Sequence, residues 1–403
     1  MTEPEPGIYG GVDTHKDLHV AAVVDQTARI RDVASFPATT AGYRQLLAWM
    51  RRYGELIRVG VEGTGSYGAG LARHLAREHV EVLDVNRPNR QARRRRGKND
   101  TVDAEAAARA ALNGDATAAP KAHDGIVESI RALRIAFCST RNARTRIANQ
   151  LRDLVLCAPD QLRRDLEALE TPARVERAAR FRPGELAEPT EGTKAAMRAL
   201  ARQYQMLTAD LGELREKLDA LTRHANPALR DARGVGLDVA SILLVAAGDN
   251  PERLTSEAAL AALCGAAPVE ASSGKVVRHR LNQGGNRQAN HALWRVAMVR
   301  LTCDPATRAY AQRRRAEGKS TREIIRCLKR YIAREIYRLL TNPPGVADRS
   351  QLRTTRTAAG LTLAAAADAL DTWPARISEL ERGAGRNDDL EHRYRLWLGL
   401  EVA

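Results

Sequence analysis

The chain has 403 residues, which is more than one ordinary domain holds and suggests two to four domains. Lysine and arginine outnumber aspartate and glutamate by 64 to 49, and the resulting formal charge of +15 indicates a polyanionic partner such as nucleic acid. The five cysteines form no C-x-x-C pair, which excludes a zinc ribbon and a disulfide framework. No stretch of about 18 residues is continuously apolar, so we expect a cytoplasmic protein with no membrane contact.

Strands alternate with helices in residues 1–120, which predicts an α/β domain. The strand patterns are two runs around a polar turn in 8–24, then 30–36, 56–63 and 80–85. The helical patterns are 42–53, 66–78 and about 101–112.

The pattern of residues 121–225 predicts helices, separated by a polar, proline-containing linker at 158–192. The second helical stretch carries apolar residues at alternating steps of three and four, the heptad pattern of a coiled coil. This arm is either an antiparallel hairpin or a dimerising element. Its seam consists of Met197, Leu200, Tyr204, Leu207, Leu211, Leu214, Leu218 and Leu221.

Two further units follow the arm. A mainly helical domain runs from 226 to 342 and ends at a Pro-Pro-Gly linker, and a small helical unit occupies 346–403.

Four carboxylates occupy positions where strands end or a helix begins. Asp13 and Glu62 each end a predicted strand, and Asp100 and Asp103 lie three residues apart at a helix start, so both project to one side. Carboxylates brought together cannot all stay ionised without a cation, and Mg²⁺ takes oxygen ligands. Taken singly, each is one of 49 acids; taken together, they predict a metal site for phosphodiester chemistry.

A basic run directly precedes Asp100. Residues 86–98 contain seven basic residues and no acidic one. Beside a metal site we expect this run to bind phosphates, whereas by itself it equally suits a solvated loop. Its candidate contacts are Arg93, Arg94, Arg95, Arg96 and Lys98.

A second basic stretch contains two serines. No acidic residue occurs from 271 to 303, and Gly284-Gly285-Asn286 marks a turn there. Ser272 or Ser273 is a candidate nucleophile if a base or a metal activates its hydroxyl. The residues alone favour an ordinary Ser-Gly turn, because no Ser/His/Asp order is evident. The candidate phosphate contacts are Lys275, Arg278, Arg280 and Arg287.

Gly234-Val235-Gly236 lies between two helical patterns and resembles a helix-hairpin-helix turn. Glycines let backbone N–H groups approach a phosphate, so Gly234 and Gly236 are candidate nucleic-acid contacts. The alternative is an ordinary glycine-containing connection between helices.

The tail resembles a helix-turn-helix of the Cro/repressor type. A short helix at 361–370 is followed by a turn, then by Pro374 at the start of a second helix that Gly383 ends. In that fold the second helix enters the major groove, so Arg376 and Glu379 are candidate groove-facing residues. The alternative is a helical bundle that contacts protein.

Five motifs, in this order and spacing, resemble the DEDD transposases of bacterial insertion sequences, also described as bridge-RNA-guided recombinases. The resemblance covers about residues 8–340, and the helix-turn-helix tail is an addition to it. Asn99 stands where the family often has Thr or Ser. The motifs are GVDTHK at 11–16, VEGTG at 61–65, KNDTVDA at 98–104, GVG at 234–236, and SSG at 272–274 with Gly285-Asn286 downstream.

The resemblance implies a RuvC-like, RNase H-type N-terminal domain whose four acids bind Mg²⁺, with Mn²⁺ as a substitute. It implies that a serine, Ser273 in preference to Ser272, forms a transient 5′-phosphoserine bond with DNA. The site would be composite, shared between subunits of a homo-oligomer, a dimer or tetramer built on the coiled coil. A structured guide RNA would pair with donor and target DNA at the bacterial nucleoid.

Two alternatives stay open. A RuvC-like, structure-selective nuclease would use metal-activated water, and Ser273 would then be structural. A non-catalytic helix-turn-helix repressor would bind DNA without cleaving it, and Asp13→Ala would leave all of its activity intact.

Overall fold

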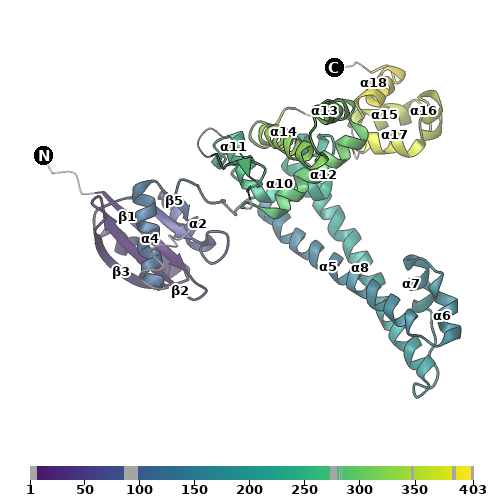
Figure 1. Ribbon diagram of the computed structural model, residues 1–403, viewed down its shortest axis with the longest axis horizontal. Coiled ribbons are helices and arrows are strands. Elements are labelled where there is room, and N and C mark those ends of the chain that lie inside the picture. The colour runs from purple at the N-terminus through teal and green to yellow at the C-terminus, as the bar shows by residue number, and fades with distance from the viewer. Residues whose placement is uncertain are drawn as a thin grey trace. The chain divides into compact units, whose positions relative to one another are not determined.

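The structure is a computed structural model that describes residues 7–85, 99–272, 279–280, 282, 284–345, 349–383 and 387–400 (Figure 1). It divides into two units. The N-terminal unit comprises residues 1–128 and 247–260, and the C-terminal unit comprises 129–246 and 261–403. In the described part of the chain, no helix is both long and apolar enough to cross a lipid bilayer.

The N-terminal unit contains a five-stranded mixed sheet in the order β3-β2-β1-β4-β5. β1, β2 and β3 are antiparallel neighbours, whereas β4 and β5 run parallel to β1. This mixed α/β sheet fits the expected RuvC-like domain. The strands are β1 (Gly7–Thr14), β2 (Leu18–Asp25), β3 (Ile30–Pro37), β4 (Glu55–Glu62) and β5 (Glu81–Val85).

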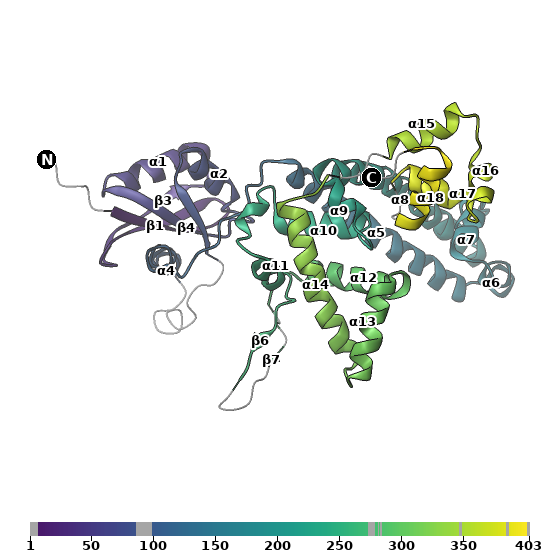
Figure 2. The same ribbon diagram turned by 90° about the horizontal axis from the view of Figure 1, so that it is seen from above.

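Helices cover both faces of this sheet (Figure 2). On one face, Val12 and Val61 join the main core with residues of α1 (Thr40–Arg51) and α2 (Ala69–Arg77). On the opposite face, Val20 and Ala22 pack against Ala104 of α4 (Asp100–Asn113). Because side chains alternate between the two faces of a strand, neighbouring residues pack against different helices.

The arm consists of two long helices, α5 (Ile126–Leu156) and α8 (Pro189–Ala225). They run antiparallel within the chain: Leu151 near the end of α5 shares a core with Met197 near the start of α8. Further along, the Arg144 guanidinium lies 5.5 Å from the centre of the Tyr204 ring. The first part of the heptad seam, from Met197 to Tyr204, therefore packs against α5 of its own chain, although Ile135, Leu156 and Met206 stay exposed.

The prediction of a plain polar linker at 158–192 was wrong, because two short helices form there. They are α6 (Asp160–Glu167) and α7 (Thr171–Ala179), and their buried faces join the core at the end of the arm. Pro172 lies in the first turn of α7 and Pro189 in the first turn of α8. Proline suits the first turn because the N–H it lacks would have no helical partner there. Two of the four prolines that suggested a linker therefore lie in the first turn of a helix.

The rest of the C-terminal unit is mainly helical. α12 and α14 pack against each other, and β6 and β7 form a short antiparallel ladder between α11 and α12. The elements of this region are α9 (Pro227–Asp231), α10 (Leu237–Ala247), the 3₁₀ turn Pro251–Arg253, α11 (Glu257–Leu263), β6 (Val269–Glu270), β7 (His279–Arg280), α12 (Arg287–Cys303), α13 (Pro305–Ala316) and α14 (Thr321–Thr341). The 3₁₀ turn and the first part of α11 belong to the N-terminal unit.

The tail forms four helices around its own small core, which includes Leu352, Ile377 and Tyr394. An ion pair between Arg356 and Glu381, with an N···O distance of 2.6 Å, is buried beside this core. The helices are α15 (Ser350–Ala358), α16 (Leu363–Ala369), α17 (Pro374–Glu381) and α18 (Asp388–Trp397).

Candidate functional site

Asp13 and Glu62 occupy equivalent positions on neighbouring parallel strands. Val12 of β1 pairs in register with Val61 of β4, so the acid that follows each valine lies at the same level of the sheet. The two acids project to the face opposite the paired valines, because side chains alternate along a strand. The Thr14 hydroxyl donates a hydrogen bond of 2.7 Å to the Glu62 carbonyl oxygen and ties the two strand ends together.

Two glycines let α4 approach the same face closely. A Cβ on Gly11 would lie 2.0 Å from the Ala108 amide nitrogen, and one on Gly60 would lie 2.5 Å from the Ala107 carbonyl oxygen. Any side chain at these positions would collide with the α4 backbone. The alternation that turns Gly11 and Gly60 toward α4 also turns Asp13 and Glu62 toward it.

The start of α4 supplies the remaining two acids. Asn99 caps the helix, since its side-chain oxygen accepts a hydrogen bond of 3.2 Å from the Thr101 amide. Asn caps a helix as well as Ser or Thr does, so Asn99 can replace the Thr or Ser that the family often has here. Asp100 and Asp103 lie in the first turn, where the helix dipole favours negative charge. Asp103 is only 3% exposed.

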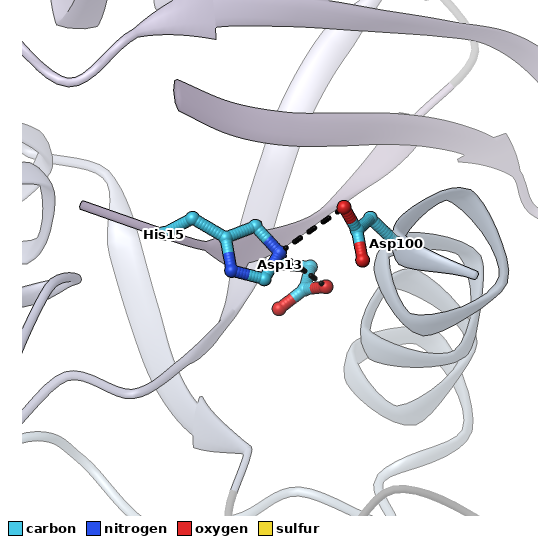
Figure 3. Close-up of side chains that lie close together, drawn as sticks. All are labelled: Asp13, His15 and Asp100. Carbon is cyan, nitrogen blue, oxygen red and sulfur yellow. Dashed lines mark ion pairs between the residues drawn. The ribbon is translucent and has the colours of Figure 1, made fainter. Parts of the chain in front are cut away.

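His15 completes the cluster, and the sequence interpretation missed it. Its Nε2 atom lies 3.3 Å from Oδ2 of Asp13 and 3.3 Å from Oδ2 of Asp100 (Figure 3). One ligand atom from each of these three residues lies within 4.8 Å of the other two. The only signal in the sequence is that His15 follows Asp13 by two residues, which is too common to be informative.

Burial and the neighbouring carboxylates both disfavour the negative charge of Asp13. Burial is the main cause that raises the pKa of Asp13, and the charges of Asp103 and Asp100 raise it further, whereas His15 opposes them. A cation among these oxygens would relieve both effects. The carboxylates of Asp13 and Asp100, with His15 beside them, therefore fit a divalent metal ion, and Asp103 is buried nearby.

The structure brings two of the four predicted acids, Asp13 and Asp100, into one group with His15, and Asp103 and Glu62 lie outside that group. Asp100 and Asp103 both act on the Asp13 carboxyl. Glu62 is a neighbour of Asp13 by strand register, although it is not part of the three-residue group within 4.8 Å. The predicted basic contacts Arg93, Arg94, Arg95, Arg96 and Lys98 lie outside the described residues.

The serine motif falls between β6 and β7 in the sequence, and Ser272 is its one residue that the structure describes. Ser272 is exposed and follows β6 by two residues, while Ser273, Lys275 and Arg278 lie outside the described residues. Arg280 belongs to β7, and Arg287 is the first residue of α12.

Gly285 of the downstream motif holds the base of the β6–β7 hairpin. Its φ of +88° is a backbone conformation that favours glycine. A Cβ there would lie 2.7 Å from both the Gly265 nitrogen and the Leu263 carbonyl oxygen. The neighbouring Asn286 amide donates a hydrogen bond of 2.6 Å to that same carbonyl. Gly285 and Asn286 thus pack against residues 263–265, which precede β6 and the serines.

Gly234-Val235-Gly236 connects α9 to α10, and Gly234 adopts a φ of +81°. The nearby cavity of about 540 Å³ contains several arginines, but carboxylates already pair with many of them. Arg134 lies 2.6 Å from Asp238 in the first turn of α10, and Arg295 pairs with the same carboxylate. A phosphate contact by Gly234 and Gly236 stays a prediction.

In the tail, α16 and α17 are joined by a short turn, and Pro374 begins α17. Arg376 and Glu379 form an exposed ion pair of 2.9 Å on α17. Both side chains are therefore accessible, and their contact with a DNA groove stays a prediction.

Comparisons with known proteins agree with this arrangement. Residues 10–157 match a family described as Transposase, and residues 226–312 match one described as Transposase IS116/IS110/IS902 family. A stretch of 141 residues is 33% identical to the "Insertion element IS110 uncharacterized 43.6 kDa protein" of Streptomyces coelicolor. That stretch is 34% of this chain and 33% of the relative, so the similarity spans about a third of the relative's length.

The first match covers the mixed α/β sheet and its acid cluster, and the second begins at α9 and extends into α13. The two matches lie in the expected order and together cover more than half of the chain. The chain belongs to the IS110 family of transposases.

Proposed function

We propose that this chain is a DNA transposase that cleaves and rejoins strands with the help of Mg²⁺, for which Mn²⁺ is a substitute. The observation that carries the proposal is the convergence of the buried Asp13 and Asp103 with Asp100 at the start of α4. Acids placed this way are costly to the fold unless a cation joins them. The basic surplus of the chain supports DNA as the polyanionic partner.

Asp13, Glu62, Asp100 and Asp103 are the residues that would hold the metal. When bound, a divalent ion lowers the pKa of an attacking hydroxyl and balances the charge that develops at phosphorus. The close packing of α4 against Gly11 and Gly60 keeps Asp100 and Asp103 at a fixed place relative to the strand ends. This rigidity is what catalytic ligands require.

Ser273 is the proposed nucleophile, with Ser272 as its rival. Its Oγ loses a proton and bonds to the DNA phosphorus, the bond from phosphorus to the 3′ oxygen breaks, and that oxygen takes up a proton. A 5′-phosphoserine and a free 3′-hydroxyl remain. A 3′-hydroxyl from another strand then attacks the same phosphorus and returns the serine, so the phosphodiester energy is conserved and the strands are joined.

The proposal includes a composite site in a homo-oligomer, a dimer or tetramer. The arm supports it, because Ile135, Leu156 and Met206 stay exposed on α5 and α8 after the two helices have paired. A structured guide RNA that pairs with donor and target DNA is part of the proposal on the family resemblance alone.

Strand joining on a DNA that carries the element's own ends tests the proposal. We expect wild type to yield joined products in Mg²⁺ and none in EDTA, and Asp13→Asn and Asp103→Asn to abolish both cleavage and joining. Asp115→Asn is the control, because this exposed acid lies just beyond the other end of α4. Cleavage without joining would favour the nuclease alternative, and DNA binding unaccompanied by cleavage in wild type would favour the repressor.

A further inference from the structure

A groove lies between the base of the β6–β7 hairpin and α14, wholly within the C-terminal unit. Its volume is about 810 Å³, within the range of roughly 300–1,000 Å³ that is usual for ligand clefts. The basic stretch predicted from the sequence ends at residue 303, before α14 begins, so this groove was not predicted. The residues that line it are Gly265, Ala266, Ala267, Pro268, Arg280, Asn282, Lys319, Glu323, Arg326, Cys327, Lys329, Arg330, Tyr331 and Arg334.

α14 forms one wall because it is amphipathic. Ile324, Leu328 and Ile332 lie on the buried face of the helix. Arg326 and Tyr331 lie on the face that lines the groove. Burial of the apolar face fixes the rotation of α14, so the groove-lining side chains are held along one side.

The floor of the groove is held by a hydrogen-bond network. The Asn290 amide nitrogen donates to the carbonyl oxygens of Cys264 and Gly265 at 2.8 and 3.1 Å. The Asn290 amide oxygen accepts a hydrogen bond of 3.0 Å from Lys329 Nζ. Lys329 is thereby held in place beneath the loop that leads into β6.

The groove is strongly positive. Its one acid, Glu323, already accepts hydrogen bonds from the Ser320 amide and hydroxyl at 2.9 and 2.7 Å. Burial lowers the pKa of Lys329, and the charge of Arg326 lowers it further. An anion in the groove would offset this repulsion. The six basic residues are Arg280, Lys319, Arg326, Lys329, Arg330 and Arg334.

Tyr331 adds an aromatic surface to this field of charge. Its side chain is 53% exposed, although its ring packs edge-on against Tyr310 at 5.7 Å. An exposed ring beside several cations is the combination that binds unpaired nucleic acid, because bases stack on the ring while the cations hold the phosphates. A base in a duplex offers no free face to such a ring.

We propose that this groove binds an unpaired DNA strand, with a base stacked on Tyr331 and phosphates held by Arg326 and Lys319. The inference rests on the proposed function, since a strand lying along the base of the hairpin leads toward the serine motif that follows β6. DNA is the occupant on this reasoning, because the strand beside the nucleophile is the one to be cut. The groove residues are positioning residues.

Strand binding by the full chain tests the inference without any chemistry. The probe is a fluorescein-labelled single-stranded DNA of mixed sequence and about 20 nucleotides, measured by anisotropy in EDTA. Tyr331→Leu is expected to weaken binding about tenfold, whereas Tyr331→Phe keeps the ring and should bind within about twofold of wild type. Arg326→Gln and Lys319→Gln should each lower the salt dependence of log K by about 0.7. Arg202→Gln, an exposed charge on α8, is the control.

The inference would be overturned if Tyr331→Leu bound the strand as tightly as wild type. It would also fail if duplex DNA or an RNA of the same sequence displaced the probe better than unlabelled single strand does. If Tyr331→Leu fails to fold, the salt dependence of the Arg326 and Lys319 variants decides the question. Normal strand binding with no joined product would contradict the proposed function and leave the groove assignment standing.

Discussion

His15 Nε2 lies 3.3 Å from a carboxylate oxygen of Asp100, so an imidazole at the end of β1 contacts an acid at the start of α4. The same nitrogen is equally close to Asp13. Both His15 and Asp100 are about half exposed, whereas the Asp13 side chain is 9% exposed. His15 lowers the pKa of Asp13 through its charge and a hydrogen bond, so the imidazole offsets part of the repulsion among the carboxylates.

His15→Ala should therefore destabilise the metal-free protein only. We expect a loss of up to about 1 kcal/mol without metal, because the contacts are half exposed, and no loss in saturating Mg²⁺. Thermal unfolding with and without Mg²⁺ measures this difference. If the variant instead lost the stabilisation that Mg²⁺ brings to wild type, His15 would be a metal ligand and the expectation would be wrong.

Gly11→Ala should disrupt the acid site by displacing α4, the helix that carries Asp100 and Asp103. The new Cβ would meet the Ala108 nitrogen at 2.0 Å and the Ala104 carbonyl oxygen at 2.3 Å, so α4 must move. We expect the free energy of unfolding to fall by about 3 kcal/mol and Mg²⁺-dependent activity to fall with it. Gly65→Ala is the matched control, since nothing lies within 4 Å of a Cβ there, and it should change stability by less than about 0.5 kcal/mol. Chemical denaturation of both variants tells the two apart.

The positions of the four acids at strand ends and at a helix start were predictable, because these boundaries have clear local signals in the sequence. Asp13 and Glu62 close apolar runs, and Asn99 precedes the helix that carries Asp103. His15 was not predictable, because its role depends on where Asp100 lies in space. For the same reason, no periodicity indicates that Gly11 faces the α4 backbone.

The helices at 160–179 and the groove show two other limits of sequence reasoning. Pro172 breaks a helix when it lies in the interior but favours one when it lies in the first turn, and the sequence alone does not separate these cases. In the sequence of α14, apolar residues separate the basic residues that form one face of the helix. This face becomes continuous only when the helix is packed, with Arg326 and Tyr331 turned to the groove.

The buried ion pair of the tail predicts a dependence of stability on pH. Burial alone would raise the pKa of Glu381, but hydrogen bonds from Arg356 and Tyr394, with the Arg356 charge, outweigh burial and lower it below its ordinary 4.5. A lowered pKa stabilises the fold above the ordinary value, and this stabilisation is lost as pH falls through the lower folded value. Protection of α17 amides from hydrogen exchange should therefore decline below about pH 4.5.

Glu381→Gln should remove that dependence and cost about 3 kcal/mol, because it leaves the Arg356 guanidinium buried without a counter-charge. Glu379→Gln, which breaks an exposed pair on the same helix, should cost less than about 0.5 kcal/mol. Equal effects of the two variants on α17 exchange would contradict this account.

A composite site predicts complementation between inactive variants. Asp13→Asn and Ser273→Ala should each lower cleavage at least about 10³-fold when tested alone. A mixture of the two should recover cleavage, because an assembly can then combine intact acids from one subunit with an intact serine from another. A mixture of Asp13→Asn with Asp103→Asn should stay inactive, because every subunit in it has a damaged acid cluster. Failure of the first mixture to recover, with normal oligomer formation, would place both halves in one subunit.

The most direct test of the whole account is to map the covalent bond between protein and DNA. After reaction in Mg²⁺, nuclease digestion and proteolysis, mass spectrometry of the peptide around 272–274 should find a nucleotide on Ser273. The bond should disappear in Ser273→Ala and in Asp13→Asn, and it should persist in Ser272→Ala. Cleaved DNA with no nucleotide on either serine would contradict the account and leave metal-activated water as the nucleophile.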